Sequence, residues 1–189
     1  MKAKFVKSCA SAHEFPKGGH DEIAFIGRSN AGKSSLLNFI LEAKGLAKTS
    51  STPGKTKLIN FFEAEGKLFV DLPGWGFARA SKAEREAWAT LIDIYLSERK
   101  ALKAVLLLLD IRRELSEEDK EMAAWLGGKG YKVIFVATKA DKLNASELHA
   151  QSRKLADILG QEPIVTSVKT GFGKAHLHKA LREAYARSL

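Results

Sequence analysis

The sequence predicts an α/β fold, a doubly wound and mostly parallel sheet with helices on both faces, formed by a single domain. Three observations predict it: a phosphate-binding loop between an apolar strand and a helix, an alternation of strand and helix signals after that loop, and polar motifs where apolar strands end. The 189 residues suffice for one buried core, and 45% hydrophobic with 28% charged residues is ordinary for a globular chain.

The elements follow one another in the order that such a sheet requires. Strand patterns cover 22–26, 58–62, 67–71, 104–109, 133–136 and 164–166, about six strands, and Cys9 is expected in a further N-terminal strand. Helical patterns cover 35–41, 83–99, 116–128, 146–159 and a terminal stretch from about 174. The continuous apolar run 104–109 is typical of a strand that is buried on both faces.

The loop at residues 27–34 reads G-x-x-x-x-G-K-[ST], the pattern of a phosphate-binding loop. Gly27 and Gly32 allow the backbone to curl so that several N–H groups point at phosphate oxygens. Lys33 offers a charge to the β- and γ-phosphates, and the Ser34 hydroxyl is a ligand for Mg²⁺. The loop therefore predicts binding of a nucleoside triphosphate with Mg²⁺.

Charge and cysteine content indicate the class of partner and the cellular compartment. The chain has 31 Lys and Arg against 22 Asp and Glu, a net charge of +9, which favours a polyanionic partner, nucleic acid ahead of a membrane surface. A merely basic, well-solvated surface is the alternative. The single cysteine, Cys9, fits a reducing cytosol. The longest apolar run is too short to span a bilayer, and no signal peptide is predicted.

A second motif follows the strand at 67–71. Asp71-Leu72-Pro73-Gly74 places a carboxylate at the carboxyl end of that strand, close to the phosphate loop. A carboxylate there is suited to hold Mg²⁺ through water, and the Gly74 N–H is suited to sense the γ-phosphate. The four residues form a weak pattern alone and a strong one at this distance after a phosphate loop.

A third and a fourth motif select the base. Thr138-Lys139-Ala140-Asp141 follows the strand at 133–136, and Asp141 is suited to accept both guanine N1–H and the 2-amino group, a pair that adenine does not present. The Lys139 stem is suited to lie along the base. Thr166-Ser167-Val168, after the last strand, is suited to close the pocket with a backbone N–H on the guanine oxo group. The predicted ligand is GTP or GDP.

On these residues the chain resembles the EngB family of translation-factor-related GTPases over nearly its whole length. The stretches that carry the resemblance are Gly27-Arg28-Ser29-Asn30-Ala31-Gly32-Lys33-Ser34-Ser35, Pro53-Gly54-Lys55-Thr56, Asp71-Leu72-Pro73-Gly74-Trp75-Gly76-Phe77-Ala78 and Thr138-Lys139-Ala140-Asp141. The resemblance implies one Ras-like GTPase domain at 22–189 with an N-terminal extension at 1–21 packed on it. It also implies that nucleotide is contacted by residues 27–35, 54–56, 71–74, Thr138, Lys139 and Asp141, together with residues 166–168.

The resemblance further implies a bacterial cytoplasmic GTPase that assists assembly of the large ribosomal subunit, with rRNA as a partner and a link to cell division and septation. Thr56 would then bind Mg²⁺ beside Ser34 and Asp71, the last through water, with Thr52 the less favoured candidate. Lys33, Thr56, Gly74 and Asn30 would carry catalysis. A monomer is the default expectation.

Two positions depart from the best-known switch proteins. Trp75 stands where a glutamine usually orients the attacking water, and it lacks an acceptor. Asn30 stands where related GTPases hold K⁺, so we expect slow hydrolysis that K⁺ or a ribosomal partner accelerates. Thr138 replaces a commoner asparagine, which predicts weaker base binding. Arg28 either touches phosphate or points to solvent.

Two other functions compete with a GTP-driven assembly factor. A metabolic P-loop kinase would need an acceptor-binding lid and should tolerate adenine, and Asp141 argues against both. A nucleotide-controlled septation or scaffold protein would bind GTP without binding the ribosome directly.

Overall fold

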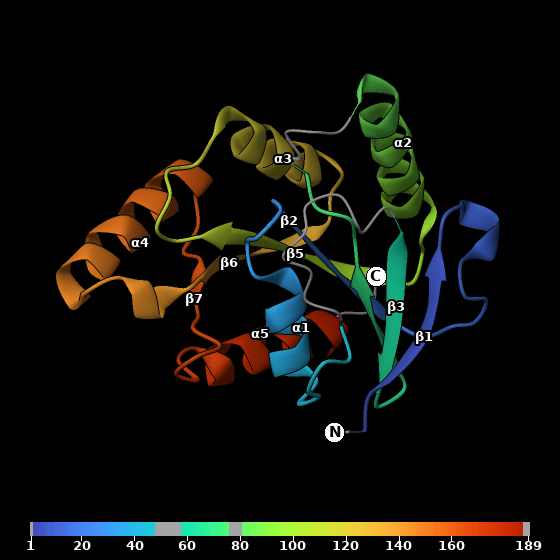
Figure 1. The fold of residues 1–189 in the computed structure, drawn as a ribbon, viewed down its shortest axis with the longest axis horizontal. Coiled ribbons are helices and arrows are strands. Elements are labelled where there is room, and N and C mark those ends of the chain that lie inside the picture. Colours follow the sequence, from blue (N-terminus) through green and yellow to red (C-terminus); the bar gives the residue numbers. More distant parts are fainter. Residues whose placement is uncertain (1, 48–57, 76–80, 187–189) are drawn as a thin grey trace.

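The computed structural model describes residues 2–47, 58–75 and 81–186, apart from the side chains of residues 82, 84 and 85. A seven-stranded sheet with the order β1-β3-β4-β2-β5-β6-β7 forms the centre of this part of the chain (Figure 1). The strands are β1 (Lys4–Cys9), β2 (Glu22–Gly27), β3 (Ile59–Ala64), β4 (Lys67–Asp71), β5 (Leu102–Asp110), β6 (Lys132–Thr138) and β7 (Ile164–Val165). The helices are α1 (Lys33–Ile40), α2 (Lys82–Glu98), α3 (Glu117–Gly128), α4 (Ala145–Leu159) and α5 (Lys174–Ala186), with short 3-10 helices η1 (Ala12–Glu14) and η2 (Ala140–Lys142).

The predicted doubly wound sheet is confirmed. Strands β4, β2, β5, β6 and β7 run parallel, while β3 pairs antiparallel with both β4 and β1. The N-terminal strand that contains Cys9 is β1, and it adds a seventh strand to the six that the patterns predicted. Residues before β2 therefore belong to the same sheet as the rest. Glu65 (φ 51°) and Gly66 (φ 71°) form the tight turn between β3 and β4, since two successive left-handed residues match the twist of a hairpin.

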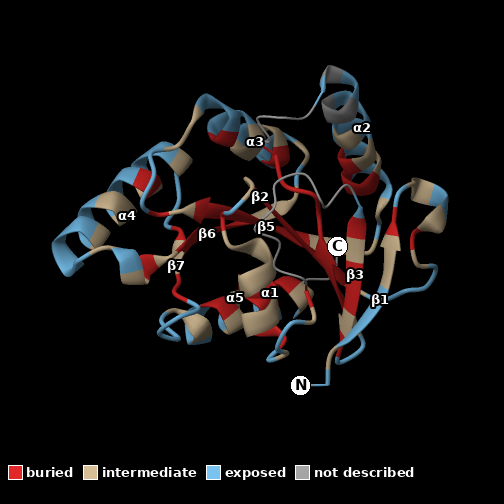
Figure 2. Cartoon of the chain, viewed as in Figure 1, coloured by how far each residue is buried: buried red, intermediate tan, exposed pale blue. Residues whose placement is uncertain are grey.

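Helices cover both faces of the sheet, and side chains of the central strands alternate between them. Ala24 and Ile26 of β2 pack in one cluster with α2, α3 and α4, whereas Ile23 and Phe25 pack in a second cluster with α1 and α5. The central strands are accordingly buried along their length (Figure 2). None of the helices in the described segments combines the length and the apolar run that a membrane crossing requires.

Because the parallel strands share one direction, their carboxyl ends meet at one edge of the sheet. The loops that follow β2, β4, β5, β6 and β7 therefore leave the sheet at this edge, and each predicted motif within the described residues lies on one of them.

Candidate nucleotide-binding site

The phosphate loop joins β2 to α1 in a tightly constrained conformation. Asn30 (φ 66°) and Gly32 (φ 94°) both adopt left-handed backbone angles. A Cβ atom on Gly27 would lie 2.8 Å from the Leu108 carbonyl oxygen, so that only glycine fits between the loop and β5. Gly32 is the N-cap of α1, and the first N–H groups of a helix have no partner within the helix. The loop thus offers backbone donors to an anion.

The segment after β4 lies directly against this loop. The Ser29 N–H donates to the Trp75 carbonyl oxygen at 2.9 Å. A Cβ atom on Gly74 would lie 2.7 Å from the Gly27 carbonyl oxygen and 3.2 Å from the Ser29 nitrogen. The structure therefore brings the first two predicted motifs together, and their approach requires glycine at position 74.

An ion pair links the two motifs. Lys33 Nζ lies 2.7 Å from Asp71 Oδ1, and the two side chains are 12% and 6% exposed. The contact lacks the alignment of a hydrogen bond, and Asp71 Oδ1 accepts no hydrogen bond from the described residues. A buried carboxylate oxygen without a hydrogen-bond donor is costly unless a ligand completes its environment.

These donors fit Mg²⁺ bound together with a nucleotide. Ser34 lies in the first turn of α1, next to the lysine that meets Asp71. Magnesium favours oxygen ligands, and it usually takes one or two from the protein and the others from phosphate and water. Across the described segments no three His, Cys, Asp or Glu side chains gather as a metal site. Ser34 and Asp71 would thus supply part of a coordination set, and phosphate and water would supply the rest.

The segment after β6 is tied to the same loop by two hydrogen bonds. The Thr138 hydroxyl donates to the Ala31 carbonyl oxygen at 2.6 Å, and Lys139 Nζ donates to the Asn30 carbonyl oxygen at 2.6 Å. Lys139 Nζ also donates to Asp110 Oδ2 at 2.8 Å. Lys139 itself has a left-handed backbone, with φ 66°. The third predicted motif is thus fixed against the first.

Asp141 and the segment after β7 form the far end of the site. The Ser167 hydroxyl donates to Asp141 Oδ1 at 2.7 Å, and this hydrogen bond holds the pKa of Asp141 below its usual value. Asp141 is therefore ionised at neutral pH and able to accept hydrogen bonds. The Ala140 N–H donates to the Thr166 carbonyl oxygen at 3.1 Å. Val168 is 40% exposed.

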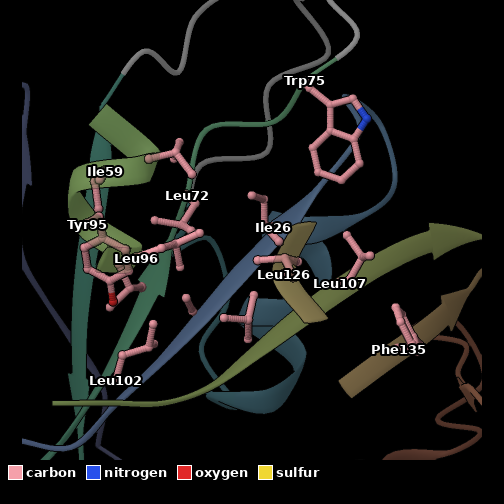
Figure 3. Close-up of a cluster of buried hydrophobic side chains, with 14 of the residues drawn as sticks. Ile26, Ile59, Leu72, Trp75, Tyr95, Leu96, Leu102, Leu107, Leu126 and Phe135 are labelled. Carbon is pink, nitrogen blue, oxygen red and sulfur yellow. The ribbon is translucent and has the colours of Figure 1, made fainter. Parts of the chain in front are cut away.

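The side chains of two predicted residues contact elements outside the predicted motifs. Trp75 is 7% exposed and packs in the apolar cluster with Ile26 and Leu126, at one end of it (Figure 3). Its indole N–H finds no acceptor among the described residues. Arg28 lies 3.9 Å from Glu118 of α3. Its charge therefore meets a carboxylate on the helix side of the loop.

The other predicted residues divide into placed residues and residues that lie outside the described part. Gly54, Lys55 and Thr56, with the competing Thr52, lie outside the described residues. Ser35 lies in the first turn of α1. The Leu72 N–H donates to the Phe25 carbonyl oxygen at 3.0 Å, and the Pro73 carbonyl oxygen accepts from the indole N–H of Trp88 in α2 at 3.1 Å.

Sequence reasoning did not select Asp110, which the structure places among these motifs. Asp110 is the last residue of β5, and its register partner across β6 is Thr138. The sequence signal was weak: a carboxylate ended a strand that was expected to be fully buried, but nothing in the sequence identified its partners. It was overlooked because Asp110 belongs to no contiguous motif.

Comparisons with known proteins give a family match over most of the chain. Residues 22–139 match the family described as 50S ribosome-binding GTPase. The chain is 45% identical over 184 residues to a probable GTP-binding protein EngB of Syntrophus aciditrophicus, covering 96% of this chain and 94% of that protein. It is 47% identical over 178 residues to the corresponding protein of Shouchella clausii, covering 92% and 90%.

Solved structures share the fold. The crystal structure of a probable GTP-binding protein EngB has a TM-score of 0.72 and 22% identity, covering 86% of this chain and 97% of that one. A structure of Era in complex with MgGDPNP and a segment of 16S ribosomal RNA has a TM-score of 0.70 and 20% identity, covering 88% and 57%. At these identities the likeness concerns the fold.

Proposed function

The chain belongs to the 50S ribosome-binding GTPase family and, within it, to the EngB GTP-binding proteins, and from that membership we propose that it is a GTP-controlled assembly factor of the large ribosomal subunit. It binds GTP and hydrolyses it to GDP and phosphate. The family match carries the assembly role. The approach of the phosphate loop to two further motifs, through Lys33 with Asp71 and through Lys139 with Asn30, supports the nucleotide site on which that role depends.

On the phosphate side, the proposed roles follow from the donors present. Loop N–H groups and Lys33 would bind the phosphates, and Ser34 and Asp71, the latter through water, would hold Mg²⁺. When bound, Mg²⁺ neutralises charge on the phosphate oxygens. Lys33 would leave Asp71 for the phosphates, and the Gly74 N–H would sense the γ-phosphate. Thr56 remains the proposed further Mg²⁺ ligand by resemblance.

On the base side, Asp141 would accept guanine N1–H and the 2-amino group, with the Lys139 stem along the ring and the backbone of 166–168 beside the oxo group. The ionised state of Asp141 supports this role. The test is Asp141→Asn with guanosine and xanthosine diphosphates. Because an amide donates where the carboxylate accepted, preference should move from guanine to xanthine. An unchanged preference for guanine would refute the pocket.

We propose that hydrolysis by the chain alone is slow. Trp75 packs in the core and has no acceptor to orient water, which supports this. Asn30 would hold K⁺ near the phosphates, with a side chain that is exposed. Turnover should therefore rise in K⁺ relative to Na⁺, or on adding large ribosomal subunits. Fast hydrolysis that is indifferent to the cation would contradict the proposal.

The partner proposed is rRNA of the large subunit, in the bacterial cytoplasm, with a link to normal cell division and septation. The family description and the net charge of +9 support it. Cosedimentation with large subunits in GTP and in GDP tests it. We expect GTP-dependent binding that weakens with salt. Absence of binding in both nucleotides would favour a scaffold protein that does not bind the ribosome directly.

A further inference from the structure

Asp110 occupies a junction that none of the assigned motifs includes. It ends β5 beside Thr138 of β6, and its side chain is 7% exposed. Three side-chain nitrogen atoms donate to its carboxylate: Lys139 Nζ to Oδ2 at 2.8 Å, Arg112 Nη2 to Oδ2 at 2.6 Å, and Arg112 Nε to Oδ1 at 2.9 Å. The Arg112 N–H adds a bond to Oδ1 at 3.2 Å. This carboxylate is therefore fully occupied by cations of two different segments.

Its charge persists despite the surroundings. Burial by itself raises the pKa of Asp110, but the hydrogen bonds from Arg112 and Lys139 outweigh it and hold the pKa well below the usual range. Charge-assisted hydrogen bonds of this kind are stronger than those between neutral groups. Asp110 thus presents a fixed negative charge to Lys139.

The conformation of Lys139 is costly in both its backbone and its side chain, so contacts that hold it are needed. Its backbone is left-handed, which a residue with a side chain rarely adopts. A lysine ammonium on a flexible stem loses much rotamer freedom when it is held. Here Nζ is held between two acceptors, Asp110 Oδ2 at 2.8 Å and the Asn30 carbonyl oxygen at 2.6 Å. The second acceptor lies in the phosphate loop, so that Lys139 links the base side to the phosphate side.

We propose that Asp110 is a positioning residue for nucleotide binding, which holds Lys139 across the junction between the base-recognition segment and the phosphate loop and thereby slows nucleotide release. The inference rests on the proposed role of Lys139 beside the base. A purely structural reading makes Asp110 the anchor of Arg112 at the end of β5. The two readings differ in which partner matters: positioning acts through Lys139, and anchoring acts through Arg112.

The experiment is a double-mutant cycle on the rate of GDP dissociation, followed with a fluorescent GDP analogue and excess unlabelled GDP. Asp110→Asn should raise the rate about tenfold, the scale expected from losing a buried charge-assisted bond. Combined with Lys139→Ala, the same substitution should change the rate less than twofold, because its target is gone. Arg112→Ala is the matched control: it also removes a partner of Asp110 and should change the rate less than twofold.

Each result decides between the readings. If Asp110→Asn keeps its effect in the Lys139→Ala background, or if Arg112→Ala matches it, the positioning role is overturned alone. If Lys139→Ala leaves GDP release unchanged, the proposed base-side role of Lys139 falls, and the inference falls with it. Thermal unfolding of each variant reports folding. Should Asp110→Asn not fold, Asp110→Glu takes its place, because it keeps a charged acceptor and displaces it by one methylene.

Discussion

Both ends of β2 lie beside a buried carboxylate, and the two carboxylates differ in their hydrogen-bond partners. At its start, Glu22 is 0% exposed; it accepts a hydrogen bond from the Tyr95 hydroxyl at 2.8 Å and bonds from two nitrogens of Arg99, one of them Nε at 3.1 Å. Beyond its other end, Lys33 meets Asp71, whose Oδ1 accepts no aligned hydrogen bond within the described residues. Aligned hydrogen bonds hold the first cluster, whereas an ion pair holds the second.

Burial and pKa shifts do not distinguish a structural charge from a charge that binds a ligand. The Arg99 guanidinium also donates to the Pro16 carbonyl oxygen at 3.1 Å and lies 5.8 Å from the Phe15 ring centre. Burial, followed by the charge of Glu22, raises the pKa of Tyr95 well above its usual value. Strong burial and a shifted pKa therefore occur at the structural end as well. What marks the binding end is a buried carboxylate oxygen that has an ion-pair partner but no aligned hydrogen-bond donor among the described residues.

The largest effect is expected from Arg99→Met. It leaves the Glu22 carboxylate buried with Tyr95 as its remaining side-chain partner, which should lower the free energy of unfolding by about 3 to 5 kcal/mol. Folded protein should keep its affinity for GDP, because the cluster lies at the far end of the strand. Chemical denaturation and GDP titration measure the two quantities. Lys100→Met, at an exposed neighbour, is the control; a large loss of GDP affinity in Arg99→Met would erase the distinction between the ends.

Lys33→Met, at the binding end, should instead lower the affinity for nucleotide. It removes the cation proposed to bind the phosphates, and GTP affinity should fall about 100-fold, equivalent to about 2.7 kcal/mol. Titration with a slowly hydrolysed GTP analogue measures it, and Lys120→Met, which breaks an exposed pair with Glu117 in α3, is the control. Retained affinity would show that Lys33 serves only to neutralise Asp71, as a structural charge would.

The fold could be predicted from the sequence because its signals are local. The continuous apolar run 104–109 lies within β5, and the pattern 67–71 coincides with β4. The helix after the phosphate loop begins at Lys33 rather than at 35, because the left-handed Gly32 already caps it. The N-terminal strand could not be paired from its pattern alone, since its register partners in β3, from Ile59 for Cys9 to Glu63 for Lys4, lie far away along the chain.

The candidate site was predictable to the extent that its chemistry is written in contiguous motifs. Lys33, Asp71 and Asp141 could be listed in advance, and the structure assembles them at one edge of the sheet. Asp110 and Glu22 could not, because their partners are set by strand register and by a helix that returns 77 residues later. A lone acidic residue in a strand carries no mark of the cation it will meet.

A smaller effect concerns acid stability. The pKa of Asp110 is lowered in the folded protein by Arg112 and Lys139, against an unfolded value of about 3.9. Its stabilising effect, about 1 kcal/mol, is therefore fully present above pH 4 and is lost as the pH falls through the folded pKa. Wild type should exceed Asp110→Asn in unfolding free energy at pH 7, and the gap should narrow steadily below pH 4.

Denaturant titrations between pH 7 and pH 2.5 measure this gap. Glu114→Gln is the control: it removes an exposed carboxylate that pairs with Lys154, and it should cost little at any pH. If the difference in unfolding free energy between wild type and Asp110→Asn is independent of pH, the carboxylate stabilises by shape rather than by charge. Asp110 would then contribute no electrostatic stabilisation at the binding edge.

The smallest effect is expected at Arg28, which lies inside the phosphate loop and pairs with a carboxylate outside it. Its guanidinium is 3.9 Å from Glu118, and the two side chains are 35% and 61% exposed. An exposed pair at that distance contributes at most about 0.5 kcal/mol, because water screens it. Arg28→Gln should therefore change the free energy of unfolding by less than that amount and GDP affinity by less than about twofold, measured by denaturation and titration. A tenfold loss of affinity would instead mean that Arg28 leaves Glu118 for a phosphate. In that case, the ion pair between Arg28 and Glu118 would not identify Arg28 as a structural charge, and its place in the phosphate loop would be the better guide to its role.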